Sequence, residues 1–460
     1  LPWSDEVLRR MEQELSGEVL SRLPGLWYPQ NGSEAPLRLA YMNAVTRLWA
    51  ENFTGQLGDW CRAHGVEYIG HILEDMNSHC RLASSAGHFF RGLSGQDMSG
   101  IDIVLHQVRP GMAHYHSAAA IADGVTDPLF FHYVLGQLAA SQARITPRMK
   151  NRAMCEVFGA YGWAEDAPMM KWLMDFLLVR GINRFVPHAF DDIFPDADCP
   201  PHFFARGNDP QFAGFTQLMH YVNALCSKLD DCDKEVPGAI LYNAEAEWMN
   251  GVKKAMLCEV PAKALYDAQI DYNLLPLDAL EAAEAADGIF RINGHDYRFL
   301  IVPAAAKYPP ALDAVLRTLR NAGVAVFFAV NEEFPAAGLS GETAAASALP
   351  ALLKDRGLAH DYSVEAPLLR IAHFAGGQYF LFNESTTESI QIEVQFPETG
   401  SYTKHDLLNG EAASGAADSG KILVELSPYQ STLLCFGETA AQPEYAAVPA
   451  AAPDLSWDID

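Results

Sequence analysis

The chain is short of positive charge. Its 460 residues include 32 Lys and Arg against 58 Asp and Glu, which gives a formal net charge of −26. Binding to nucleic-acid phosphates or to an anionic membrane surface needs clustered Lys and Arg, so we expect neither partner. No apolar run reaches about 18 residues, the length that a membrane-spanning helix requires. The sequence therefore predicts a soluble protein that acts on neutral or small substrates.

Paired cysteines and phosphate-binding loops are also lacking. The eight cysteines are scattered, and no CxxC pair occurs. In a chain of this length, that pattern is typical of reduced, buried thiols in a cytoplasmic protein. Neither a GxGxxG sequence nor a P-loop is present, so we assign no nucleotide and expect no cofactor.

What the chain does contain, between residues 39 and 230, is an alternation of helices and short apolar strands. This alternation predicts a parallel sheet with right-handed crossovers. The predicted strands are 66–75, 100–107, 151–159 and 182–190, and the predicted helices are 39–65, 126–144, 167–181 and 210–229.

Four strand–helix units are half of a (β/α)8 barrel, which takes about 250 residues when complete. The chain also opens directly into an amphipathic helix, without a methionine or a signal sequence. We therefore expect the first half of the barrel to lie outside this chain, on a segment upstream or on a partner chain. A homo-oligomer is the remaining alternative.

Two further patterns follow the barrel half. Strand–helix alternation resumes after Pro237 and predicts a doubly wound sheet of flavodoxin type, with helices at 277–286 and from about residue 343. From residue 367 the apolar period changes to two, which is typical of an antiparallel β-sandwich. The predicted organisation is a (β/α) barrel domain at 1–235, a flavodoxin-like α/β domain at 236–362, a β-sandwich at 363–438 and an Ala/Pro-rich tail at 439–460.

Polar residues end each predicted barrel strand, and in a (β/α)8 barrel the catalytic groups lie at that edge. Glu156 ends the third strand, and Tyr161 and Trp163 follow it. Aromatic faces of this kind stack on the apolar faces of sugar rings. The alternative is a salt-bridged glutamate at a strand end, with both aromatic side chains in the core.

Cleavage of a glycosidic bond needs two carboxyl groups, one to protonate the leaving oxygen and one to attack or to activate water. Glu74 and Glu156 are the best pair in this sequence. Alternatively, Glu74 or Asp75 caps a following helix, which is ordinary for an acidic residue at a helix start.

The histidines at the strand ends suit hydrogen bonds to substrate hydroxyls. No two of them stand at a metal-ligand spacing such as HxH or HExxH, so no metal site is predicted. The acidic run that contains Asp192 is either a solvated loop or a site for sugar hydroxyls or calcium. The predicted substrate-binding residues are His71, Asp75, His106, Gln107, Tyr161, Trp163, His188 and Asp192.

These motifs carry a resemblance to a known family. The stretch CEVFGAYGW, preceded by WCRAHGVEYIGHILED and GIDIVLHQ and followed by MKWLMDFLLVRGINRFVPHAF, resembles bacterial glycosyl hydrolases related to the family 106 α-L-rhamnosidases over residues 1–230. The next domain resembles the flavodoxin-like domain of family 42 β-galactosidases. The resemblance implies that Glu156, at the seventh barrel strand, is catalytic. Its partner is either Glu74 or a carboxylate on a strand outside the chain.

These features predict a cytoplasmic glycoside hydrolase that acts on a glycoside or oligosaccharide, either α-L-rhamnosidase-like or β-galactosidase-like. The alternative is a non-catalytic carbohydrate-binding or assembly subunit that completes its barrel with a partner segment. An upstream reading frame that encodes the first barrel units would favour the enzyme, and its absence would favour the subunit.

Overall fold

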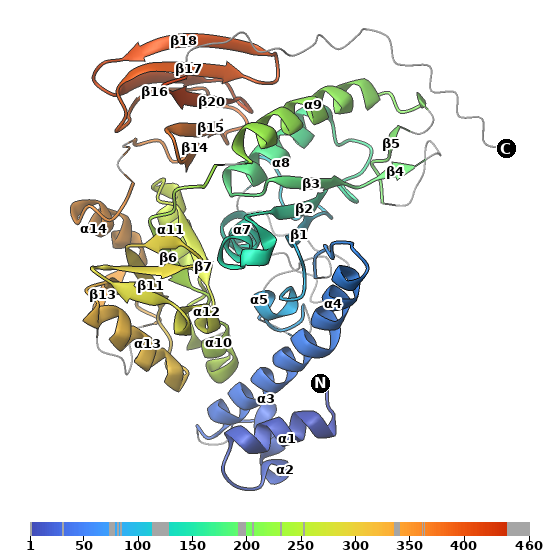
Figure 1. Ribbon diagram of the computed structural model, residues 1–460, viewed down its shortest axis with the longest axis vertical. Helices are drawn as coiled ribbons and strands as arrows, with labels where there is room; N and C mark the ends of the chain where they lie inside the picture. Colours follow the sequence, from blue (N-terminus) through green and yellow to red (C-terminus); the bar gives the residue numbers. More distant parts are fainter. Residues whose placement is uncertain are drawn as a thin grey trace, which may run out of the picture.

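A computed structural model provides the structure, which contains three main sheets. Helices flank the first two, and the carboxyl-terminal strands lie at one end of the molecule (Figure 1). No helix among the described residues is long and apolar enough to span a membrane. The structure describes residues 2–29, 32–72, 79–80, 82, 85–112, 128–191, 199–204, 207–230, 232–251, 254–334, 341–360, 362 and 364–438.

The amino-terminal part is helical. Helix α1 (Asp5–Glu14) begins at Ser4, whose hydroxyl accepts a hydrogen bond from the Val7 backbone N–H (3.3 Å). Helix α3 continues through a π-helical turn into α4, so a single helical rod leads toward the first sheet (Figure 1). The rod confirms the helix predicted at 39–65. The rod consists of α3 (Glu34–Trp49), η2 (Ala50–Gly55) and α4 (Gln56–Ala63), and the short helix α2 (Val19–Arg22) precedes it.

The first sheet is parallel, with strand order β1-β2-β3, as the sequence predicted for these strands. Asp102, Glu156 and Val186 are register partners, so their side chains share one face. The opposite face packs into the main apolar core through Ile101, Cys155 and their neighbours. The elements are α5 (Phe89–Gly92), β1 (Ser99–Ile103), α6 (Pro128–Phe130), η3 (Phe131–Leu135), α7 (Gly136–Ile145), β2 (Ala153–Val157), α8 (Ala167–Val179), β3 (Arg184–Pro187), β4 (Phe190–Asp191), β5 (Phe203–Phe204) and α9 (Phe212–Leu229).

These strands are shorter than predicted. Leu105 and His106 have positive φ angles of 55° and 59°, and Phe158 has a φ of 88°, so the backbone leaves the extended conformation soon after β1 and β2. Residues 66–70 of the first predicted strand are not a strand, although they lie beside β1, where the Asp97 N–H donates to the Tyr68 carbonyl (2.8 Å). The described residues form an open sheet and no closed barrel.

The second main sheet has five parallel strands in the order β13-β12-β11-β6-β7. Numbered along the chain, this is the flavodoxin-like order 2-1-3-4-5. Two details were predicted wrongly. The helix predicted at 277–286 ends at Glu281 and is followed by a small antiparallel sheet, β8-β9-β10, and residues 342–345 form a strand before the helix begins.

The tight turns at Asp287–Gly288 and Asn293–Gly294, all at positive φ, define that small sheet. The elements of this part are β6 (Gly238–Leu241), α10 (Ala244–Asn250), α11 (Glu259–Asp267), β7 (Tyr272–Leu275), α12 (Leu277–Glu281), β8 (Glu284–Ala286), β9 (Ile289–Ile292), β10 (His295–Tyr297), β11 (Phe299–Pro303), α13 (Pro310–Asn321), β12 (Ala325–Val330), β13 (Glu342–Ala345) and α14 (Leu349–Asp355).

Antiparallel strands make up the carboxyl-terminal part, as predicted. They form a five-stranded sheet, β14-β15-β20-β17-β18, and a two-stranded sheet, β16-β19. The sequence did not predict β18, because its segment EAASGAA lacks bulky apolar residues. The strands are β14 (Leu369–Phe374), β15 (Gln378–Asn383), β16 (Ile390–Gln395), β17 (Gly400–Asp406), β18 (Glu411–Ala417), β19 (Lys421–Leu426) and β20 (Ser431–Phe436).

A shared core holds the three parts together, and it includes side chains from all three main sheets. At the junction of the first and third parts, Glu384 accepts from Arg180 (2.9 Å) and from Arg370 (2.6 Å). Burial alone would raise the pKa of Glu384, but Arg370 and Arg180 lower it to about 2. This buried charged network therefore fixes the end of α8 against β14 and β15.

Candidate active site

The predicted site residues gather at the carboxyl-terminal edge of the first sheet, because the ends of parallel strands meet at one edge. Glu156 is the second-last residue of β2, and His188 directly follows β3. His106 follows β1, and His71 follows the segment that lies beside β1.

Glu156 makes the central contact of this edge. Its Oε2 lies 3.2 Å from Nε2 of His71, and both side chains are partly exposed. The hydrogen bond from His71 lowers the pKa of Glu156, burial opposes it, and the electrostatic influence of His71 and His188 lowers it further. The net shift is downward, so Glu156 is a carboxylate at neutral pH.

Asp102 stands on the other side of the same histidine. It is the register partner of Glu156, and its Oδ2 lies 4.0 Å from Nδ1 of His71. Its side chain is almost completely buried. The imidazole of His71 therefore lies between two carboxylates. Sequence reasoning missed Asp102, although an acidic residue in the middle of the apolar strand GIDIVL was a usable signal.

His106 and His188 present further ring nitrogens near this edge. Among the described residues, no hydrogen-bond partner reaches the buried Nδ1 atom of either one. Burial lowers the pKa of His106, and the neighbouring Arg109 lowers it further, which favours the neutral imidazole. The ring of His188 lies so close to Gly159 that a Cβ there would be 3.2 Å from the ring Cγ. Gly159 thus allows the close approach of the two strand ends.

Two of the predicted substrate-binding residues, Tyr161 and Gln107, are buried. Tyr161 is only 3% exposed, and its hydroxyl donates to the Val108 carbonyl (2.6 Å) and accepts from the Val108 N–H (3.2 Å). Gln107 is also buried, and its Oε1 accepts from the Val104 N–H (3.0 Å). Both side chains fix the loop after β1, and neither offers an exposed face to a sugar.

The remaining predicted residues fall into two groups. Trp163 is partly exposed, and its ring centroid lies 5.9 Å from that of His202. Glu74, Asp75 and Asp192 lie outside the described residues. The neighbouring Asp191 is described, and its Oδ2 lies 3.6 Å from Nδ1 of His202.

Glu165 is a second carboxyl that sequence reasoning missed. It lies between β2 and α8 and is 1% exposed, and within the described part of the chain neither of its carboxyl oxygens has a hydrogen-bond partner. Burial, together with the negative charge of Asp166, raises the pKa of Glu165 to about 9. Glu165 is therefore neutral at pH 7. The sequence GWAEDAP reads as a polar loop and gives no sign of this burial.

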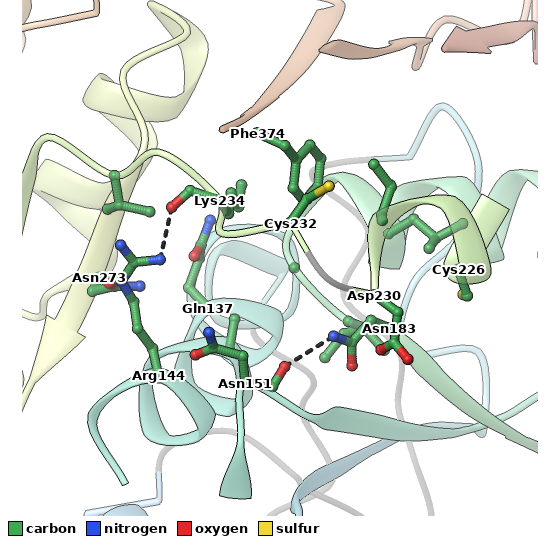
Figure 2. Close-up of a pocket in the computed structure, with 16 residues that line it drawn as sticks. Gln137, Arg144, Asn151, Asn183, Cys226, Asp230, Cys232, Lys234, Asn273 and Phe374 are labelled. Carbon is green, nitrogen blue, oxygen red and sulfur yellow. Dashed lines mark hydrogen bonds between the residues drawn. The ribbon is translucent and has the colours of Figure 1, made fainter. Parts of the chain in front are cut away.

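A small pocket of about 60 Å³ lies at the opposite end of the sheet (Figure 2). Asn151 and Asn183, which precede β2 and β3, are joined there by a hydrogen bond from Asn183 Nδ2 to the Asn151 carbonyl (2.9 Å). Arg144 donates to the Lys234 carbonyl (2.7 Å) on another wall (Figure 2). Residues at the amino-terminal face of such sheets serve stability, so we assign this pocket no part in the candidate site.

No family model and no curated protein sequence matches this chain. Among solved structures, it is similar to a rhamnosidase from Novosphingobium sp. PP1Y, with a TM-score of 0.66 and 15% identity over 98% of this chain and 44% of that chain. It is also similar to Gan42B, a GH42 beta-galactosidase, with a TM-score of 0.62 and 10% identity over 94% and 75% of the two chains.

An exo-carrageenase GH42 from Bacteroides ovatus is similar too, with a TM-score of 0.59 and 11% identity over 94% of this chain and 62% of that chain. These likenesses show that the chain shares a glycoside hydrolase fold. They support the kind of fold that the sequence predicted, without assigning a family. The chain spans less than half the length of the rhamnosidase.

Proposed function

We propose that this chain contributes to the catalytic centre of a glycoside hydrolase, with Glu156 as its ionised carboxylate. The observation that supports this proposal is the contact between Glu156 and His71 at the carboxyl-terminal edge of the sheet. It lowers the pKa of Glu156 despite partial burial. A carboxylate in this state can attack an anomeric carbon, or it can take a proton from an attacking water.

The roles of the other groups follow from the ionised state of Glu156. The leaving oxygen needs a proton, and an ionised Glu156 has none to give, so the general acid is a second carboxyl. Glu74 remains our candidate for it, alongside a carboxylate on a strand outside this chain. His71 positions Glu156 through the 3.2 Å contact, and Asp102 orients the far side of the His71 ring.

For the substrate, we propose a glycoside or oligosaccharide of the rhamnoside or galactoside class, by analogy with the similar structures. His106 and His188 would donate or accept hydrogen bonds with sugar hydroxyls through the Nδ1 atoms that have no partner in the described part of the chain. Trp163 would stack on the sugar ring. Asp75 and Asp192 remain proposed contacts.

The edges of the first sheet support completion by further strand–helix units. On the β1 side Val66 is 52% exposed, and on the β3 side Val186 is 42% exposed and Phe190 is 60% exposed. Strands of a closed barrel would cover such side chains. We propose that these units come from a longer product or from a partner chain.

A second candidate function rests on the same open edges of the first sheet. Glu74, the proposed general acid, lies outside the described residues, so a subunit that binds carbohydrate without cleaving it is also consistent with the geometry. A test of this alternative needs both halves of the barrel, because only the complete site can show activity.

The deciding experiment is the substitution Glu156→Gln, assayed on aryl glycosides of rhamnose, galactose and glucose. The protein is the full-length product, or this chain together with a segment that supplies the other barrel units. Gln keeps the volume of Glu but can neither attack nor take a proton, so we expect kcat to fall about 10²–10⁴-fold. The exposed Glu411→Gln on β18 is the matched control. Wild-type rates for Glu156→Gln, on a substrate that the parent cleaves, would contradict the proposal.

A further inference from the structure

Three potential metal ligands converge on the β-sandwich, in a different part of the fold from the candidate active site. His405 and Cys435 are buried, Glu438 is exposed, and one ligand atom from each lies within 4.8 Å of the other two. The closest pair is His405 Nε2 and Glu438 Oε2, which are 2.7 Å apart. No other group of this kind was found among the described residues.

The sheet register explains why these three meet. Thr403 on β17 is the register partner of Cys435 on β20, and His405 lies two residues further along β17, on the same face. Glu438 follows β20 by two residues. Its backbone carbonyl accepts a hydrogen bond from the Thr403 hydroxyl (3.1 Å), which fixes the turn that carries it.

We propose that His405, Cys435 and Glu438 bind a divalent cation of the zinc type. An imidazole nitrogen, a thiolate sulfur and a carboxylate oxygen form a ligand set that Zn²⁺ accepts, with water in the fourth position. Hard cations such as Mg²⁺ and Ca²⁺ prefer sets made of oxygen ligands alone. The mixed set therefore selects against them.

In the part of the chain that the structure describes, the three ligand atoms contact one another and, weakly, Gln378, whose Oε1 lies 4.0 Å from Cys435 Sγ. Lys228 on α9 contacts Glu438 through Oε1 (3.3 Å), so Oε2 remains for the cation. Within the described residues, the buried Nδ1 of His405 has no hydrogen-bond partner, so the contact made by Nε2 governs the ring orientation. Burial raises the pKa of the Cys435 thiol to about 12, and the neighbouring Glu438 adds to the rise. The bound cation would displace this proton, as cations do at thiol ligands.

The position of the cluster gives the cation a structural role. It lies where the sandwich meets α9, the last helix of the first part, and Lys228 of α9 already contacts Glu438 across this junction (Figure 1). Gln378 on β15 donates to Cys232, just beyond α9 (3.1 Å), and lies 4.0 Å from Cys435. A cation bound here would tie the sandwich to that helix, independently of any glycosidase activity.

The test uses untagged full-length chain, stripped with a chelator and titrated with Co²⁺ and then with Zn²⁺. We expect about one Co²⁺ per chain, with the ligand-to-metal charge-transfer band that a thiolate ligand gives, and loss of this band as Zn²⁺ replaces Co²⁺. Cys435→Ser should abolish the band. His405→Ala and Glu438→Gln should each weaken binding at least about 10-fold.

Two controls keep the outcome interpretable. Cys61→Ser, on α4, should retain both the band and the affinity. Far-ultraviolet circular dichroism of each variant shows whether it is folded, and the substitution at the exposed Glu438 disturbs the core least. The proposal is overturned if the parent protein gives no thiolate band, or if folded Cys435→Ser keeps it.

Discussion

Glu156 and Glu165 lie nine positions apart, at the end of β2 and in the loop after it, yet their environments shift their pKa values in opposite directions. His71 lowers the pKa of Glu156, whereas burial without a hydrogen-bond partner among the described residues raises that of Glu165 to about 9. Residue type and sequence neighbours gave no warning of this difference. Each carboxyl leads to a separate prediction.

For Glu165 the prediction concerns stability. Its pKa in an unfolded chain is about 4.3, so above that pH the unfolded state releases a proton that the folded state retains up to a pH of about 9. Stability due to this group therefore falls as pH rises, by up to about 1.4 kcal/mol per pH unit. We expect Glu165→Gln to become more stable relative to the parent between about pH 5 and about pH 8, measured by urea denaturation. The same relative stability at both pH values, as expected for the exposed Glu12→Gln, would contradict the assignment.

For Glu156 the prediction concerns the pH dependence of activity. His71→Ala removes the hydrogen bond that lowers the pKa of Glu156, while the burial that raises it remains. Since Glu156 must be ionised to act, the acidic limb of the kcat/KM profile should move to higher pH. His64→Ala, a change at an exposed position, should leave that limb in place. A purely structural role for His71 would lower the rate at every pH without moving the limb.

At the scale of elements, the sequence predicted most strands and helices because their apolar periods are clear. α8 and α9 were placed within two residues, and the strand order of the flavodoxin-like sheet matches the predicted type. The errors occur where the signal is local or absent: β18 is built from Ala, Ser and Gly, and β13 has the composition of a helix. β1 is shorter than predicted because Leu105 and His106, which are not glycines, have left-handed backbone conformations. Sequence composition does not encode such conformations.

The network of Arg180, Glu384 and Arg370 gives a prediction at this scale. Removing the charge of Glu384 leaves two buried guanidinium groups without their shared carboxylate, so Glu384→Gln should cost about 3–5 kcal/mol of unfolding free energy. Glu393→Gln breaks an exposed pair with Lys421 (2.6 Å) and should cost less than about 1 kcal/mol. Urea denaturation of both variants gives the comparison. Equal costs would show that the network does not fix the junction between α8 and the sandwich.

At the scale of the whole molecule, the candidate sites depend on contacts between segments that are distant in the sequence, and the sequence could not predict these contacts. His71 and Glu156 are 85 positions apart, and Asp102 joins them only because β1 and β2 pair in register. His405 and Cys435 are 30 positions apart and meet only through the pairing of β17 with β20. The sequence predicted the edge where Glu156 lies, but the partners of Glu156 and the sandwich cluster required the assembled fold.

The central claim is that Glu156 is the carboxylate at the reacting carbon, and chemical rescue tests it most directly. In Glu156→Ala, assayed on an activated aryl glycoside in the complete barrel, a small anion such as azide can enter the space of the lost side chain and act in its place. We predict that azide restores turnover of this variant and yields a glycosyl azide, whereas Glu411→Ala is fully active and unaffected. Full activity of Glu156→Ala without azide would contradict the account.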